Sequence, residues 1–481
     1  MNKPVQPNAV AEVRGGPIVG RRITEELAAF CVGLKADAIP APAYDAAKRF
    51  LLDFCAVALR GSLEQSSQIV ARMVERLSPA RSDGSQVIGH AVRHSPEYAA
   101  LINGTSLHGL ELDDIHPVAA IHPGAAIFPA VLAIGEAVNA SGKDLLAAVI
   151  VGYEVSCRLS RALVPSEHGP HGFHSTATCG VFGATAAIAR LMGLTADQLV
   201  NAFGINGSQA AGSVEFLTDG AWTKRMHPGW AAHGAIIAAE LARGGFTGPR
   251  RILEGKAGFL RSYSDRPQVD RVLADLGEGF EILGVAVKPH AACRYSQAAI
   301  DAILALVAEH DVKPDQVDRV TVGTFQGGIP IVAEPLAVKR RPRSVVDAQF
   351  SIHFASAAAI MRRAVTLADY KPDRMFSPEM HAMMDKVDCV HAPELDSLFP
   401  KLWPANVEIA LRGGAKLQKR VDVLHGDPED PLSWDELIGK VDTVAADVLP
   451  KERRALLVAG VRDLENRSVR AFAELLRRPA A

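Results

Sequence analysis

No Cys-x-x-Cys pair occurs in this 481-residue chain, whose six cysteines are spread widely between Cys31 and Cys389. This spacing argues against a zinc ribbon or a thioredoxin-like redox site, because both need paired thiols. In a long chain, scattered cysteines are typical of reduced thiols in a reducing compartment. Residues 1–16 are polar and contain no apolar core of a signal peptide. We therefore expect a soluble, cytoplasmic protein.

Long apolar runs are also missing, since stretches such as residues 145–151 are far too short to span a bilayer. The 52 basic and 54 acidic residues give a net charge of -2, which offers no electrostatic footprint for nucleic acid or an anionic membrane. The sequence has no dinucleotide fingerprint, Walker-type phosphate loop or iron–sulfur cysteine cluster. We therefore expect no cofactor, and neither nucleic acid nor a membrane as a partner.

What the chain does have is a helical pattern from about residue 22 to 265. One apolar periodicity stops at Gly61, and Ser95 followed by Pro96 marks a helix start. Thr195 and Gln198 have the spacing of a capping box. We expect helices over residues 44–60, 124–139, 143–163 and 228–243. No stretch here is typical of a strand, so the pattern predicts an all-α unit over residues 1–267.

The pattern changes after about residue 265. Residues 317–324 alternate apolar and polar side chains, and two further alternating runs flank Gly413-Gly414 as in a β-hairpin. Helices are expected between these strands, over residues 296–309 and 344–363, and again after Ser433, which forms a capping box with Glu436. The predicted fold class is mainly α: a large all-helical domain (residues 1–267 and 428–481) with an inserted smaller α+β domain (residues 268–427).

Histidine is concentrated beside glycine or proline in four segments, each just before an apolar helix: residues 108–124, 168–180, 219–233 and 287–302. This placement aims backbone N–H groups and side-chain cations at one ligand, as an anion requires. Removing a proton next to a carboxylate needs a base with a pKa near neutrality and cations that stabilise the enediolate. Imidazole is such a base, and nearby cations lower the pKa of a lysine towards the same range. The residues therefore indicate acid–base chemistry on an anionic substrate.

Two other interpretations stay open. Asp113, Asp114 and His116, followed by His122, offer oxygen and nitrogen ligands for a metal-dependent hydrolase, although no His-Glu-x-x-His spacing supports a metal site. A non-catalytic carboxylate-binding protein would need the same cations without any chemistry.

At these segments the sequence resembles the MmgE/PrpD (2-methylcitrate dehydratase) family, over residues 22–475. The resemblance is carried, in order, by LLDFCAVALRG, NGTSLHGLELDDIHPVAAIHPGAAIFPAVLA, HGFHSTATCGVFGATAAIARLMGL, EFLTDGAWTKRMHPGWAAHGAIIA and VKPHAACRYSQAAIDA. It implies a helical domain with an α+β lid, a homodimer and no organic cofactor. The implied function is that of a lyase or isomerase that transfers a proton alpha to a carboxylate on a small di- or tricarboxylic acid. Members include 2-methylcitrate dehydratase, cis-aconitate decarboxylase and iminodisuccinate epimerase, and the segment EFLTDGAWTKRMHPGWAAH is most similar to the epimerase-type branch.

The resemblance also implies site residues. The family's pocket histidines fall on His122 and His174, and its pocket lysines fall on Lys224 and Lys288. We expect His174 and Lys224 to transfer protons while His122 polarises the enediolate. We expect Lys288 to bind substrate. Glu111 and Asp114 are also expected at the substrate-binding site, where they orient the histidines.

Three positions depart from the family pattern. Glu111 stands where members usually have Asp, Ile115 where they often have Thr, and Phe354 where many have an active-site Tyr. The two lost hydroxyl groups weaken the case for 2-methylcitrate dehydration or cis-aconitate decarboxylation as the specific reaction.

Overall fold

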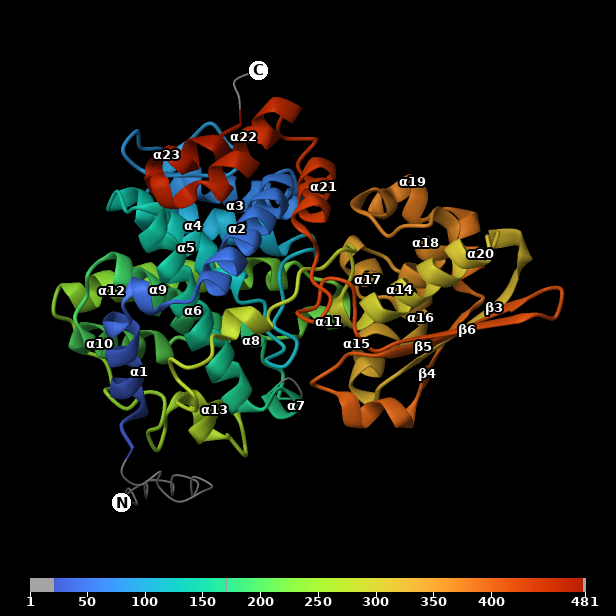
Figure 1. Ribbon diagram of the computed structural model, residues 1–481, viewed down its shortest axis with the longest axis horizontal. Coiled ribbons are helices and arrows are strands. Elements are labelled where there is room, and N and C mark those ends of the chain that lie inside the picture. The colour runs from blue at the N-terminus through green and yellow to red at the C-terminus, as the bar shows by residue number, and fades with distance from the viewer. Residues whose placement is uncertain (1–20, 169–170, 479–481) are drawn as a thin grey trace, which may run out of the picture.

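The computed structural model describes residues 21–168 and 171–478, so the polar residues 1–16 and Gly169-Pro170 of the second histidine segment lie outside it. Helices dominate, which confirms the predicted mainly-α class, and a smaller α+β part stands beside the helical body (Figure 1). Across the described ranges, every helix is too short or too polar to cross a membrane.

The helical body is built around two helices that are buried along almost their whole length, α5 (Gly124–Ala137) and α6 (Gly142–Leu163). Around them lie α1 (Ile23–Gly33), α2 (Ala41–Gly61), α3 (Gln65–Leu77), α4 (Pro96–His108), α9 (Gly180–Leu191), α10 (Ala196–Gly207) and α12 (Thr223–Arg243). The expected capping box of Thr195 and Gln198 begins α10. α4 and α12 cross at a glycine pair, because a Cβ on Gly104 would lie 2.6 Å from the Cα of Gly229. Only glycine permits this close approach.

The expectation of an all-α first unit was wrong in one place. Strands β1 (Ser85–Gln86) and β2 (Arg93–His94) form a small antiparallel pair in the helical body. The Ser85 hydroxyl donates to the Ala133 carbonyl, and the backbone N–H of Gln86 donates to the Glu136 carboxylate. Two-residue strands are too short to show an alternating pattern, so contacts with α5 define them rather than local sequence.

The α+β part contains a four-stranded sheet in the order β4-β3-β5-β6. Three of its strands were expected: β3 (Val317–Thr324), β5 (Ala405–Leu411) and β6 (Lys416–Val421), the last two forming the hairpin around Gly413-Gly414. β4 (Val387–His391) was missed and pairs in parallel with β3. Only the first residue of β4 is fully buried, so it lacks a clear apolar alternation. Helices α14 (Arg294–Glu309) and α18 (Ile352–Arg362) pack against the sheet.

One expected helix is divided in two. The segment 344–363 forms α17 (Val345–Gln349) and α18, because the chain leaves the helical conformation at Phe350 and Ser351. The Ser351 hydroxyl then accepts the N–H of Phe354 and starts the second helix as an N-cap.

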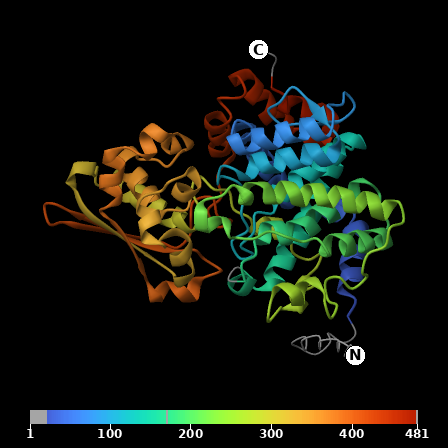
Figure 2. The same cartoon turned by 180° about the vertical axis from the view of Figure 1, so that it is seen from behind.

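The C-terminal helices return to the helical body, as expected. α21 (Trp434–Val444) and α22 (Lys451–Arg462) pack on α2, and α23 (Val469–Ala473) packs on α5 (Figures 1 and 2). Ser433 and Glu436 form the expected capping box at the start of α21. The chain therefore leaves the helical body once, builds the sheet and comes back.

Candidate active site

A cavity of about 170 Å³ lies between the helical body and the α+β part. Four of the expected residues line it from the helical side: Glu111, His122, His174 and Lys224. The α+β part contributes the opposite wall, with Arg294 and Tyr295 from α14 and the aromatic rings of Phe350 and Trp403. The cavity therefore has charged groups on both walls, and the α+β wall adds aromatic rings.

Two buried lysines meet at one carboxylate. Lys224 Nζ, in the first turn of α12, donates to Glu111 Oε1, and Lys288 Nζ lies 3.4 Å from Glu111 Oε2. Lys288 Nζ also lies 3.7 Å from Asp113 Oδ1. Lys288 is fully buried and lies behind the cavity wall, so in this structure it reaches the cavity through Glu111.

Burial and mutual repulsion set the protonation of these lysines. Burial lowers the pKa of Lys224 well below its ordinary value, and the neighbouring Lys288 lowers it further. The pKa of Lys288 is also lowered by burial, although the Asp113 carboxylate opposes the shift. An amine whose pKa is lowered in this way can give or take a proton near neutral pH.

Glu111 occupies an unusual backbone conformation. Its φ of 56° lies in the left-handed region, which non-glycine residues rarely adopt. Such conformations persist where the surrounding structure fixes them, often at functional sites. Here the fixing contacts are the two lysines, so the strained backbone holds the carboxylate between both cations.

Asp113 joins two histidines. Its Oδ2 lies 2.6 Å from His108 Nδ1 and 3.3 Å from His122 Nδ1. Burial favours the neutral form of Asp113, but His122, His108 and Lys288 outweigh burial and lower its pKa. Burial also lowers the pKa of His122 to about 4 and that of His108 to about 3, so both rings are neutral at pH 7. His122 Nδ1 lies 2.7 Å from the Asp114 carbonyl and donates to it, which leaves the Nε2 lone pair free to accept a proton.

His174 is coupled to a second histidine. Its Nδ1 lies 3.0 Å from Nδ1 of His227, so one ring donates and the other accepts. The His174 ring also stacks on His108 at a centroid distance of 5.5 Å. Burial lowers the pKa of His174 well below its ordinary value and that of His227 to about 4. His108 and His227 belong to the histidine segments of the sequence, but their spacing gave no signal that they support His122 and His174.

Asp114 does not take the position expected of a substrate-binding residue. Its carboxyl group faces away from the cavity and accepts the Tyr153 hydroxyl at 2.6 Å and the Gly124 N–H at 3.3 Å. Burial raises its pKa to about 8, so it is protonated at neutral pH. Asp114 does position His122, as expected, but through its backbone carbonyl, and two adjacent aspartates in a sequence do not reveal which one points inwards.

Lys440, which the sequence did not indicate, links two loops of the site. Lys440 Nζ, from α21, donates to the carbonyl of Leu112 at 2.9 Å and to that of Lys288 at 2.8 Å. It also forms a 2.5 Å ion pair with the buried carboxylate of Asp53. Lys440 thus connects the loop that carries Glu111 and Asp113 with the loop that carries Lys288.

The chain matches two family models. Residues 25–272 match the MmgE/PrpD N-terminal domain, and residues 290–464 match the MmgE/PrpD C-terminal domain. The chain belongs to the MmgE/PrpD family. The matches cover both walls of the cavity.

Several characterised MmgE/PrpD relatives are similar over most of their length. The cis-aconitate decarboxylase-like protein oryM of Aspergillus oryzae is 29% identical over 461 residues, covering 92% of this chain and 94% of the relative. The cis-aconitate decarboxylase of Homo sapiens is 28% identical over 458 residues, covering 93% and 92%. That of Aspergillus terreus is 26% identical over 459 residues, covering 90% and 91%. The similarity to the epimerase-type branch stays a prediction.

The departures from the family pattern have different structural consequences. Ile115 lines the cavity, and its backbone exchanges two hydrogen bonds with Ala286, so it helps to join the two parts of the chain. Phe354 is buried in α18 and packs on Tyr370 at a centroid distance of 5.1 Å, outside the residues that line the cavity. Tyr295 is the tyrosine among the described residues that line the cavity.

Of the metal ligands suggested by the Asp-Asp-x-His pattern, Asp113 and His122 come together, whereas Asp114 and His116 lie elsewhere. Asp114 binds Tyr153, and His116 Nε2 lies 3.0 Å from Glu281 Oε2. With His108 as a third member, Asp113 and His122 have ligand atoms within 4.8 Å of one another. The Lys288 ammonium group already lies close to Asp113, and a metal cation there would be repelled by it. The arrangement is better suited to proton transfer.

Proposed function

We propose that this MmgE/PrpD protein is a cofactor-independent lyase that transfers a proton at the carbon next to a carboxylate of a small di- or tricarboxylic acid. The observation that carries the proposal is the buried Lys224–Glu111–Lys288 group beside two neutral histidines, with Lys224, Glu111 and both histidines lining one cavity. The decarboxylase names of the relatives support lyase chemistry.

The proposed reaction begins with binding of the substrate carboxylate. A substrate carboxylate gains charge-assisted contacts from Lys224 and Arg294, which belong to opposite walls of the cavity. Nε2 of His122 or of His174 accepts the α-proton, and the electron pair of the C–H bond moves into an enediolate. The Lys224 ammonium group stabilises this charge. Loss of a β-leaving group, or return of a proton to carbon, completes this reaction. In a decarboxylation the electron pair comes instead from the bond between carbon and the departing carboxylate, and the proton is delivered to carbon.

The aromatic rings of the cavity support the choice of a small acid with a hydrocarbon segment. Phe350 and Trp403 can bury the carbon skeleton while Arg294 beside them and Lys224 opposite hold the carboxylates. Lys224 Nζ itself lies 5.3 Å from the centre of the Phe350 ring, so the two walls meet at this lysine. Both parts of the chain must therefore be closed together when the reaction occurs.

Product analysis tests the proposal. The purified protein, treated with a chelator, is incubated with a tricarboxylate such as cis-aconitate, a 2-hydroxytricarboxylate such as 2-methylcitrate, and an iminodisuccinate-type dicarboxylate, and products are followed by NMR. We expect one class to lose carbon dioxide or water without any added cofactor. Inversion without loss of a group would assign an epimerase instead. Activity that disappears with chelator and returns with a divalent metal would support the hydrolase, and binding without turnover would support a carboxylate-binding protein.

A further inference from the structure

Among the cysteines of the described residues, Cys293 is the one that lines the active-site cavity. It stands at the N-cap of α14, a helix of the α+β part (Figure 1), and is 5% exposed. Its backbone N–H donates to the Gln349 carbonyl at 2.9 Å, which holds the residue in the cavity wall. The proposed reaction, as it stands, leaves this thiol without a role.

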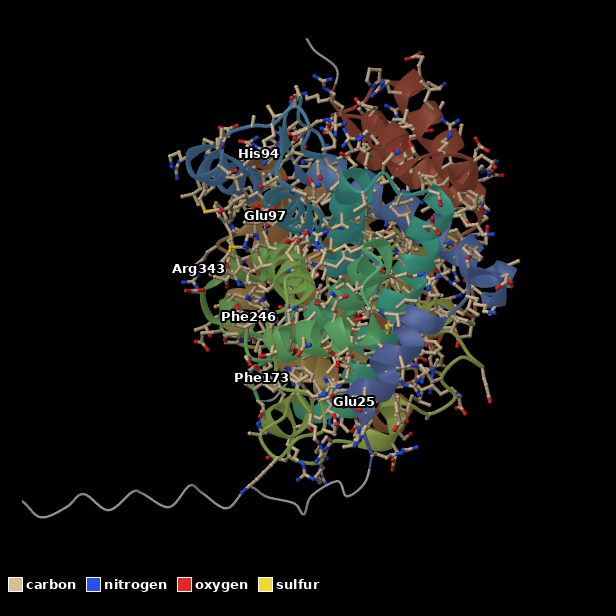
Figure 3. All side chains as sticks on the ribbon, turned by 90° about the vertical axis from the view of Figure 1, so that its left-hand side faces the viewer. Glu25, His94, Glu97, Phe173, Phe246 and Arg343 are labelled. Atoms are coloured by element: carbon tan, nitrogen blue, oxygen red, sulfur yellow. The ribbon has the colours of Figure 1, made fainter. Side chains whose placement is uncertain are left out.

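The thiol and the histidines reach the cavity from opposite walls. His122 and His174 belong to the helical body, where Phe173, labelled in Figure 3, precedes His174 and lines the same cavity. Cys293 belongs to the α+β part. A substrate held between the two walls therefore turns one face of its α-carbon towards a histidine and the other face towards the thiol.

Two cations lie within electrostatic reach of the thiol. Burial lowers the pKa of Lys224 and that of Lys288, and a negative charge on Cys293 opposes this shift in both. The attraction is mutual, so both ammonium groups stabilise a thiolate at Cys293. The positive end of the α14 dipole adds to this stabilisation, because the 16-residue helix starts at Cys293. A thiol in this place can give up a proton while the negative charge that results is stabilised.

Arg294, next to the thiol, has a buried donor that can bind a substrate carboxylate. Its side chain is 3% exposed, lies 2.5 Å from Asp427 Oδ1 and is 5.7 Å from the centre of the Trp403 ring. Its Nε is buried and has no hydrogen-bond partner among the described residues. Buried donors are normally hydrogen-bonded, and a carboxylate in the cavity can accept from this one. A carboxylate bound there lies beside Cys293, which brings the neighbouring carbon close to the thiol.

We propose that Cys293 is a second acid–base residue, which delivers a proton to the α-carbon on the face opposite the histidines. The inference rests on the proposed function, because it needs the enediolate formed there. The S–H bond breaks, and a C–H bond forms with the electron pair of the enediolate. The two lysines and the start of α14 stabilise the thiolate, which then takes a proton from solvent, while the histidine that accepted a proton releases it to solvent. The new hydrogen enters from the α+β side, whether the electron pair came from a C–H bond or from loss of carbon dioxide.

Alkylation tests the position of the thiol without reference to turnover. Iodoacetate and iodoacetamide are applied separately to the native protein, and the modified peptides are identified by mass spectrometry. Iodoacetate carries the carboxylate that the cations attract, so we expect it to alkylate Cys293 about tenfold faster than the uncharged reagent does. Lys224→Met should reduce this preference, and malonate should protect the thiol. Failure of both reagents to modify Cys293, or faster modification by iodoacetamide, would overturn the proposal.

Stereochemistry tests the proton delivery. The wild-type protein, Cys293→Ser and the matched control Cys389→Ser, at a half-buried cysteine on β4, are incubated in deuterium oxide with the acid that the wild-type protein converts. Wild type and control should place deuterium on one face of the carbon. Cys293→Ser should keep its far-UV circular dichroism, lower turnover at least about 100-fold and lose this selectivity, because deuterium then arrives from a histidine or from solvent.

Two results would overturn the role of Cys293 and leave the proposed function standing: wild-type turnover and selectivity in Cys293→Ser, or a wild-type product that gains no solvent hydrogen at carbon. A wild-type protein that transfers no proton to or from the carbon of any acid would refute the proposed function, and the inference with it.

Discussion

Replacing Lys440 by Met should damage the site from outside the cavity. The substitution removes two hydrogen bonds to loop carbonyls and leaves the carboxylate of Asp53 buried without its cation. The Lys440 side chain is 8% exposed and that of Asp53 is 1% exposed, so water can do little to replace the lost partner. Removing one member of a buried ion pair costs about 3–5 kcal/mol. We therefore expect Lys440→Met to lower the free energy of unfolding by about 3 kcal/mol or more.

A second variant separates the effect of Lys440 on the stability of the fold from its effect on the position of the two loops. The double variant Asp53→Asn, Lys440→Met has no charge buried at this pair. Because the two residues contact each other, their effects are coupled, and the free energy of unfolding should be about 1–3 kcal/mol higher than that of Lys440→Met alone. The two loops would still lack the ammonium group that joins Leu112 to Lys288. The KM for the carboxylate substrate should therefore stay raised by about tenfold, equivalent to about 1.4 kcal/mol of binding, even where stability has recovered.

The assay combines urea denaturation with steady-state kinetics. Lys48→Met is the matched control, because Lys48 on α2 forms a 2.5 Å ion pair with Glu465 but contacts neither loop. The control should change stability little, since its partner is partly exposed, and should leave KM unchanged. If KM of the double variant equals that of wild type, Lys440 stabilises the fold without positioning the site, and the reasoning is refuted.

Three further predictions concern the site itself. Lys224→Met should lower turnover at least about 100-fold with unchanged far-UV circular dichroism, whereas Lys256→Met, at an exposed lysine, should not change turnover; activity within threefold of wild type would remove Lys224 from the mechanism. Burial raises the pKa of Asp114 to about 8, whereas an aspartate in the unfolded chain titrates at about 3.9, so the native state loses about 1.4 kcal/mol of stability per pH unit between these two values and no more above the higher one. Asp114→Asn should flatten the loss measured by urea denaturation between pH 5 and 8, and an unchanged slope would contradict the assignment. A dicarboxylate should protect residues 265–296 from hydrogen exchange, and Lys288→Ala should remove most of that protection; protection of the helical domain alone would exclude a site built from both parts.

Local sequence predicted the elements whose signal is local. The alternation in residues 317–324 gave β3, and the capping pairs gave the starts of α10 and α21. β4 was missed because its side chains are mostly half-exposed or exposed, and parallel pairing with β3 joins segments far apart in the chain. The break between α17 and α18 was missed because helical periodicity continues through it.

The same distinction between local sequence signals and contacts with distant residues applies to the candidate site. His122, His174, Lys224 and Glu111 could be found because they lie in distinctive segments, and the structure brings them to one cavity. Lys440 is 328 positions from Leu112, whose carbonyl it binds, and nothing in its own helix marks it.

The central claim is proton transfer at the carbon next to a carboxylate, and exchange of that proton with solvent measures it most directly. The protein is incubated in deuterium oxide with each acid that binds, and the recovered acid and its product are examined by NMR and mass spectrometry. We predict deuterium at the α-carbon with the wild-type protein and none above background with Lys224→Met. An acid that turns over with neither loss of its α-proton nor deuterium at that carbon, or equal exchange by both proteins, would contradict the account.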